Sequence, residues 1–168
     1  MREDLKRHIY AGIILVVSLA ADLYTKYLAV THIHEYERIN VLGSFVQLTL
    51  LYNQGGLFGI LQGYQAYFLV ISLIVLVLLV LFYFFEKNRT MLFSSAMAFI
   101  ISGALGNIYD RLSGRKGVVD FLYIGHDEVF RWPAFNIADA AIVVGAILLM
   151  IFFYLDEKKR RKEKPSDQ

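Results

Sequence analysis

The chain has 168 residues, of which 57% are hydrophobic and 19% are charged, with a formal net charge of +2 and a mean hydropathy of +0.51. Soluble domains of this length rarely carry so few charges, so the composition argues against a soluble globular protein. Cysteine is absent, which excludes disulfide bonds, thiol catalysis and lipidation of this chain at cysteine. The expected solvent is therefore a lipid bilayer.

Four apolar segments are long enough to cross a membrane as helices, which takes about 20 residues each. They are residues 9–30, 66–85, 91–109 and 135–155. The first could also be a cleaved signal peptide, because basic residues precede it and Ser18-Leu-Ala-Ala21 imitates a cleavage site. The apolar pattern resumes after Asp22, which favours a retained span. We therefore expect an all-α membrane protein that forms one domain over residues 1–168.

Lysine and arginine flank these spans unevenly. Most of the 17 lie before the first span, between the second and third, or after the fourth. Because cytoplasmic segments retain basic residues, we expect both termini in the cytoplasm. The basic tail, residues 156–168, is polar and is expected to be disordered.

The two outer connections have different patterns. Residues 46–52 alternate partly with the period of a strand, and Asn53-Gln-Gly-Gly56 has the composition of a turn. Together with the apolar residues 57–61, they predict a small β hairpin or curled sheet within residues 31–64. Residues 112–133 mix charges with aromatic side chains, which is typical of an interfacial loop.

Ionisable and amide side chains gather near the outer ends of the spans, where a membrane makes them costly. Asp22 and Lys26 share one helix face at i and i+4 and can pair. The third span ends with Asn107, Asp110 and Arg111. Bracing of the bundle explains these residues at least as well as chemistry does. Asn53 could bind a peptide backbone or simply form the turn.

Two aspartates flank the second connection. Asp139 lies in the first turn of the fourth span, where Asn136 has the spacing of a helix cap. Asp120 stands between apolar residues without an evident cap, and a surface pair with Arg115 or Lys116 is its simplest structural explanation. Folding of the connection could bring both carboxyls together, one protonated and one charged, and such a pair can hydrolyse an amide without a metal or a covalent intermediate.

Other functions have weaker support. The sequence has no His-Glu-x-x-His or Gly-x-Ser-x-Gly, and its histidines offer only the weak pair His32 and His34. We therefore expect no metal and no cofactor. A proton-coupled carrier or assembly factor that uses Asp22/Lys26 and Asp110/Arg111 is the main alternative, followed by a structural membrane subunit. Neither alternative explains Asp120.

Five motifs, in the same order and spacing, resemble bacterial lipoprotein signal peptidase, also called signal peptidase II. Asp22-Leu-Tyr-Thr-Lys26 is similar to the family's Asp-x-x-Thr/Ser-Lys element, and Asn53-Gln-Gly-Gly56 to its Asn-x-Gly-Ala element. The other three motifs lie at residues 103–111, 118–121 and 135–139. The sequence departs from the family pattern at Gly56, where alanine is usual, and at Tyr109, where an aliphatic residue is usual.

The resemblance implies an aspartic endopeptidase whose catalytic residues are Asp120 and Asp139. Further residues would bind the substrate or organise the site: Asn53, Gly55, Asn107, Arg111, Asn136, Asp22, Lys26 and Asp110. The substrate would be a diacylglyceryl-modified prolipoprotein, cut just before its lipid-bearing cysteine at the outer face of the bacterial inner membrane. We expect this substrate and membrane lipids as partners, no nucleic acid, and a monomer. We also expect the outer hairpin and the 112–133 loop to clamp the substrate.

Overall fold

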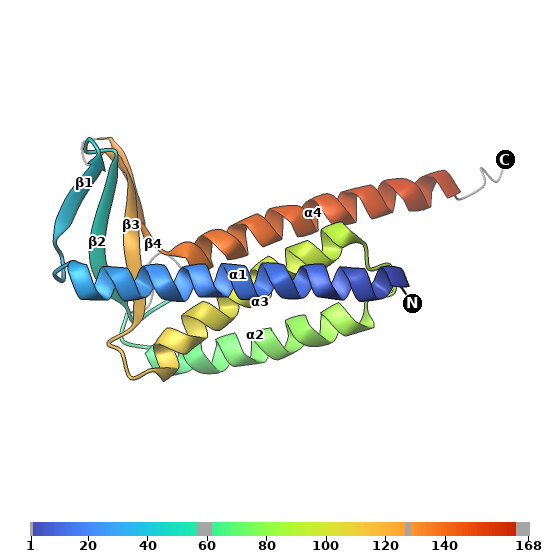
Figure 1. Ribbon diagram of the computed structural model, residues 1–168, viewed down its shortest axis with the longest axis horizontal. Helices are drawn as coiled ribbons and strands as arrows, with labels where there is room; N and C mark the ends of the chain where they lie inside the picture. The colour runs from blue at the N-terminus through green and yellow to red at the C-terminus, as the bar shows by residue number, and fades with distance from the viewer. Residues whose placement is uncertain (1, 57–61, 127–128, 164–168) are drawn as a thin grey trace.

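The computed structural model describes residues 2–56, 62–126 and 129–163 (Figure 1). Residues 57–61, expected to follow the turn of the hairpin, and residues 164–168 of the predicted tail lie outside the described residues. The helices are α1 (Arg2–His32), α2 (Gln65–Phe85), α3 (Met91–Leu112) and α4 (Ile137–Glu163). All four are long and apolar enough to cross a membrane, which confirms the four predicted spans.

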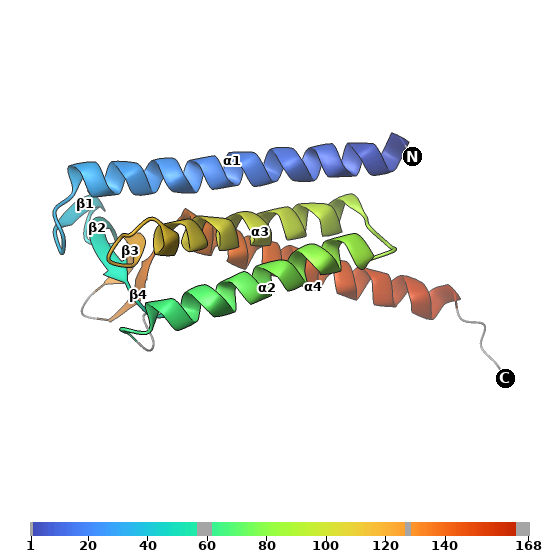
Figure 2. The same cartoon turned by 90° about the horizontal axis from the view of Figure 1, so that it is seen from below.

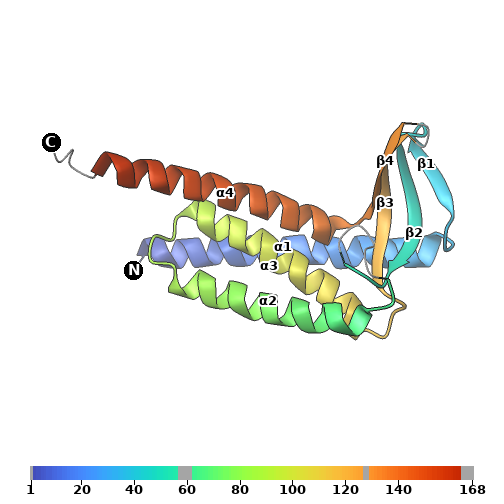
Figure 3. The same ribbon diagram turned by 180° about the vertical axis from the view of Figure 1, so that it is seen from behind.

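Helix α4 is longer than the predicted fourth span. It continues through Glu163, so the disorder expected from residue 156 onward is wrong for residues 156–163. Two ion pairs at i and i+4, Asp156–Arg160 and Glu157–Arg161, support these last turns, each at 2.8 Å. The start of α1 and the last turns of α4 lie at the same end of the bundle, away from the sheet (Figures 1 and 3).

Helix α3 lies at the centre of the bundle and packs against each of the other three helices (Figure 2). Half of the residues in the most apolar 18-residue stretch of α3 are buried, whereas α2 has no buried residue. A Cβ at Gly103 of α3 would collide with the carbonyl oxygen of Ala138 in α4. Glycine at this position therefore lets the two helices approach closely, which matters in lipid, where no hydrophobic effect drives helices together.

At the end of the bundle that is remote from the sheet, aromatic side chains lie between α2 and α4. Phe93 and Phe152 are buried there, with their ring centroids 5.1 Å apart. Phe82 of α2 stacks on Phe153 of α4 with a centroid separation of 6.4 Å. The two helices therefore meet through aromatic rings at the end that is remote from the sheet.

Four antiparallel strands form one sheet in the order β1-β2-β3-β4. The strands are β1 (Arg38–Leu42), β2 (Val46–Asn53), β3 (Val118–His126) and β4 (Phe130–Phe135). The predicted strand at residues 46–52 is confirmed as β2, and a hairpin lies within residues 31–64 as expected, but it pairs β2 with the preceding β1 and turns at residues 43–45 rather than at Asn53-Gln-Gly-Gly56, at the end of β2. The interfacial loop expected at residues 112–133 is instead mostly strand, because β2 offers a pairing edge to the apolar run that begins at Val118.

This pairing also concerns the two segments of the expected clamp. Leu51 of β2 is opposite Asp120 of β3, and Tyr52 is opposite Val119. The hairpin and the second connection are therefore parts of one hydrogen-bonded sheet, and the expected clamp of the substrate by these two segments stays a prediction.

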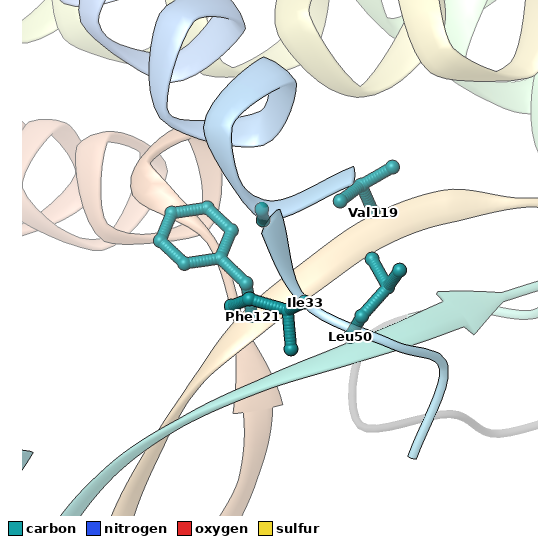
Figure 4. Packing of buried hydrophobic residues seen from close by; sticks show 5 residues of the cluster. Ile33, Leu50, Val119 and Phe121 are labelled. Carbon is teal, nitrogen blue, oxygen red and sulfur yellow. The ribbon is translucent and has the colours of Figure 1, made fainter. Parts of the chain in front are cut away.

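A small hydrophobic cluster fixes the sheet on the last turn of α1. Ile33, directly after α1, Leu50 from β2, and Val119 and Phe121 from β3 pack together, and all four are buried (Figure 4). Since side chains alternate across a strand, Val119 and Phe121 face α1 while Asp120 between them points the other way. The packing of two apolar neighbours thus directs the carboxyl of Asp120 toward α3 and α4.

Candidate active site

Asp120 is held in a buried position by two amides. Asn136 Nδ2 donates a 2.7 Å hydrogen bond to Asp120 Oδ1, and Asn53 Nδ2 donates one of 3.2 Å to Oδ2. Burial, followed by the charge of Asp139, raises the pKa of Asp120 to about 7, although both amide hydrogen bonds lower it. This carboxyl can therefore hold a proton near neutral pH. The surface pair considered from the sequence is absent among the described residues, because Arg115 contacts Asp110 and Lys116 pairs with Glu35.

Asp139 serves both as a helix-capping residue and as part of the site. Its backbone N–H donates to Asn136 Oδ1 at 2.9 Å, and the Asn136 N–H donates to Asp139 Oδ2 at 3.2 Å. This reciprocal pair is a capping box at the start of α4, as the spacing predicted. The other oxygen, Oδ1, accepts a 2.8 Å hydrogen bond from Asn107 Nδ2. The cap therefore aims the carboxyl toward α3.

Asn107 and Asn136 connect the two aspartates. Asn107 Oδ1 accepts from Lys26 Nζ at 3.0 Å and from Asn136 Nδ2 at 3.2 Å. An ammonium group can only donate, so Lys26 fixes which end of the Asn107 amide faces it. The opposite end, Nδ2, must then face Asp139. Asn136 Nδ2 in turn reaches Asp120, so each carboxyl receives an amide donor whose orientation is determined.

Behind these amides lies a buried cluster of charges. Lys26 Nζ is 2.8 Å from Asp22 Oδ2 and 2.9 Å from Asp110 Oδ2, and all three side chains are at most 1% exposed. Asp110 also contacts Arg115 and accepts the N–H of Val119 at 3.2 Å. The two anions and two cations balance one another, which offsets much of the cost of burying them.

The charge cluster fixes the relative positions of the elements that carry the aspartates. Asp22 Oδ1 accepts the N–H of Ala138, the residue before Asp139, at 2.8 Å. Asp110 holds the N–H of Val119, the residue before Asp120. The geometry thus supports the bracing interpretation of Asp22, Lys26 and Asp110.

Replacement of Gly106 by alanine is expected to disturb this cluster. A Cβ at Gly106 would collide with the Asp22 carboxylate and would lie 3.3 Å from the Ala138 Cβ. We expect Gly106→Ala to lower the free energy of unfolding by about 1–3 kcal/mol, as overpacking of a rigid interior does. The measurement is thermal unfolding in detergent. Gly12→Ala is the matched control, because a Cβ there meets nothing within 4 Å. Equal melting temperatures for the two variants would contradict this account.

The turn after β2 makes polar contacts with Arg111 and positions Asn53. Arg111 Nη2 donates to the carbonyl of Gly55 at 3.0 Å, while its Nε has no hydrogen-bond partner among the described residues. Asn53 Oδ1 accepts from the Gly55 N–H and from Gln62 Nε2, each at 3.0 Å. These donors turn Asn53 Nδ2 toward Asp120. Gln62 was not predicted as a site residue, since a lone glutamine in a connection carries no distinctive sequence signal.

Polar side chains from the end of β2, from α3, from β3 and from α4 line one cavity of about 560 Å³. Five predicted site residues line its polar end: Asn53, Asn107, Arg111, Asp120 and Asp139. The other predicted residues, Gly55, Asn136, Asp22, Lys26 and Asp110, do not line it and instead hold the lining residues in place. Mostly apolar side chains of α2, α3 and α4 form much of the remaining wall, and the sheet and the turn after β2 add Gly56, Val118, Trp132, Ala134 and Phe135. The arrangement offers two carboxyls at one end of a pocket suited to an apolar ligand.

Comparisons with known proteins agree with the motifs. The family described as signal peptidase (SPase) II matches residues 14–155. Among curated proteins, the lipoprotein signal peptidase of Clostridium novyi (strain NT) is 36% identical over 135 residues, which cover 80% of this chain and 90% of the relative. The lipoprotein signal peptidase of Francisella tularensis subsp. novicida (strain U112) is 39% identical over 142 residues, covering 80% and 85%.

Two solved structures of bacterial membrane enzymes share the fold of this chain. A bacterial membrane enzyme determined at 2.3 Å resolution superposes with a TM-score of 0.81 at 30% identity, covering 94% of this chain and 93% of that one. A second, determined at 1.9 Å resolution, gives a TM-score of 0.74 at 32% identity, covering 85% and 91%. With its four apolar helices and its paired aspartates at one cavity, the chain belongs to the signal peptidase II family.

Proposed function

We propose that Asp120 and Asp139 perform the reaction of this aspartic endopeptidase, the cleavage of diacylglyceryl-modified prolipoproteins immediately before the lipid-bearing cysteine. One observation carries the proposal: the buried carboxyl of Asp120 and the half-buried carboxyl of Asp139, from different elements, line a single cavity and are held by oriented amides. Amide donors fix the position of a carboxyl without neutralising it, so the pair keeps its acid–base capacity.

The two carboxyls would share one proton. Burial and the nearby charge of Asp139 favour the protonated form of Asp120, so the pair holds one negative charge near neutral pH. The charged carboxylate takes a proton from water, and the water oxygen attacks the scissile carbonyl carbon. The protonated carboxyl donates its proton to the carbonyl oxygen, which gives a tetrahedral diol. The carboxyl that took the proton from water then delivers it to the leaving nitrogen as the carbon–nitrogen bond breaks, and a diol hydroxyl returns a proton to the other carboxylate. This sequence needs no covalent enzyme intermediate.

The position of the pair suits a substrate that is anchored in lipid. Asp139 is the third residue of α4, about 3 Å along the helix axis from its start at 1.5 Å per residue, so its carboxyl lies near one end of the span. Much of the apolar wall of the cavity belongs to α2, α3 and α4, and this part runs along the bundle away from the carboxyls. A lipid-linked cysteine would enter from the bilayer with its scissile bond close to the interface.

Localisation follows the distribution of charge. This is a multi-pass membrane protein. We propose that it resides in the bacterial inner membrane with both termini in the cytoplasm and the sheet and active site at the outer face, because the basic residues concentrate at the end opposite the sheet. One chain supplies every polar group described above, which supports a monomer that works with prolipoprotein and lipid and without nucleic acid. The carrier alternative gains no support from the relatives.

The pH dependence of cleavage tests the proposed function. With a diacylglyceryl-prolipoprotein as substrate, we expect kcat/KM of the purified enzyme to fall about tenfold per pH unit above pH 7, because the proton on Asp120 is lost as the pH rises through its pKa of about 7. We also expect a fall at low pH, where both carboxyls are protonated. The same prolipoprotein without lipid is the control and should be cut poorly. Activity that rises steadily to pH 9, or equal cleavage of both substrates, would contradict the proposal.

A further inference from the structure

Phe68, in the first turn of α2, forms part of the cavity wall, although the sequence did not single it out. Its ring lies directly on Gly56. A Cβ at Gly56 would be 2.6 Å from Phe68 Cε1 and 2.9 Å from Cζ. Real side chains do not approach so closely, so the ring can occupy this place only because residue 56 is glycine.

The Gly56 backbone on which the Phe68 ring rests is connected to Asp120 through hydrogen bonds of Asn53. The carbonyl of Gly56 accepts a 3.1 Å hydrogen bond from Asn53 Nδ2, and the same nitrogen donates to Asp120 Oδ2 at 3.2 Å. Gly56 is buried, and a hydrogen-bonded turn supports it from behind. The ring therefore rests on backbone that is fixed relative to Asp120, and it cannot recede toward the turn.

Phe68 is also the outermost member of an apolar stripe. Three more apolar residues of α2 line the same cavity at helical spacing, Ile71, Val75 and Leu79, and Ser72 lies beside them with its hydroxyl donating to the Phe68 carbonyl at 2.6 Å. The stripe extends from Phe68 away from the sheet, along about 16 Å of helix at 1.5 Å per residue. Phe68 thus lies at the boundary between the apolar part of the cavity and the end that holds the carboxyls.

We propose that Phe68, seated on Gly56, limits the size of the apolar substrate group that lies beside the scissile bond. The inference rests on the proposed function and extends it to specificity. Two parts of a prolipoprotein have the required chemistry: the side chain that precedes the lipid-bearing cysteine, and the lipid on that cysteine. A ring that cannot move back restricts either group, because a close-packed wall discriminates by single methylene groups.

The test compares size preferences. Wild type, Phe68→Ala, Gly56→Ala and the double variant are assayed on two substrate series. One series varies the residue before the cysteine from glycine through alanine and valine to leucine, and the other varies the lipid from monoacylglyceryl to diacylglyceryl. The readout is the ratio of kcat/KM for the largest and smallest group in each series, so that a general loss of activity cancels. We expect Phe68→Ala to raise this ratio about tenfold in one series.

The remaining variants make the test specific to the Gly56–Phe68 contact. Gly56→Ala should push the ring into the cavity and lower the ratio, and the added Phe68→Ala change should reverse that fall. Val70→Ala is the matched control, because Val70 is 55% exposed on the same helix and does not line the cavity. The series in which the ratio shifts identifies the group that Phe68 contacts.

Two results would overturn the inference, and they show whether the proposed function fails with it. If wild type cleaves the substrates but Phe68→Ala and Val70→Ala give the same ratio in both series, Phe68 does not set specificity and the proposed function stands. If wild type cleaves no prolipoprotein of either series, the proposed function fails and this inference fails with it.

Discussion

Lys26→Met is expected to lower the free energy of unfolding by about 3–5 kcal/mol, because it leaves two buried carboxylates without their shared cation. Lys26 is fully buried and lies within 3 Å of both Asp22 and Asp110. Asp110 would keep Arg115 and the Val119 N–H, whereas Asp22 would keep only the Ala138 N–H among its described partners. Thermal and denaturant unfolding in detergent would measure the loss.

The same substitution should reduce catalysis by more than the loss of folded protein explains. Without the ammonium group, the Asn107 amide loses the shorter of the two hydrogen bonds to its oxygen and is oriented only by the 3.2 Å bond from Asn136 and by its own bond to Asp139, so its donor is held less firmly toward Asp139. Lys116→Met is the matched control, since Lys116 is exposed and pairs with Glu35 at the surface. If both variants unfold at the same temperature and cleave at the same rate, the charge cluster neither braces the bundle nor orients Asn107.

The spans could be predicted from sequence because the bilayer imposes length and composition on them. The segment 66–85 is almost free of polar groups, and the structure has α2 over Gln65–Phe85. The end of α4 could not be predicted in the same way. Its last turns are polar and are stabilised by local ion pairs, which the hydropathy criterion for a span does not detect.

The sheet was only half predictable. The alternation of residues 46–52 predicted β2, but the glycines at residues 55 and 56 favoured a turn after this strand, whereas the hairpin turn precedes it at residues 43–45. Strand β3 pairs with β2, more than sixty residues away along the chain, as in the pairs Asn53↔Val118 and Val46↔Ile124. Nothing in residues 112–133 alone specifies such a partner, so their charges and aromatic rings favoured a loop.

The site was more predictable than the sheet because membranes make polar groups conspicuous. Asp120 stood out as an acid among apolar neighbours, and Asn136 as a cap for Asp139. Gln62 and Phe68 did not stand out. Gln62 lies in a polar connection, and α2 is apolar on all sides, so no periodicity distinguishes its cavity face from its lipid face.

Asp120→Asn and Asp139→Asn should each lower kcat by about 10²–10⁴-fold, the usual contribution of a general acid or base. Asparagine has nearly the same shape as aspartate but cannot exchange a proton at neutral pH. Neither variant should be much less stable than wild type. Burial disfavours the charged form of Asp120, so a neutral amide there removes a desolvation cost while keeping an oxygen that can accept from Asn136 or Asn53.

The most direct test is therefore the cleavage rate of one diacylglyceryl-prolipoprotein by purified wild type, Asp120→Asn and Asp139→Asn, with the melting temperature of each recorded in the same detergent. Asp4→Asn, at an exposed position on the first turn of α1, is the control and should cleave at the wild-type rate. We predict that both site variants fold and lose cleavage. A folded Asp120→Asn or Asp139→Asn protein that cuts at the wild-type rate would contradict the assignment of these two residues as the catalytic pair.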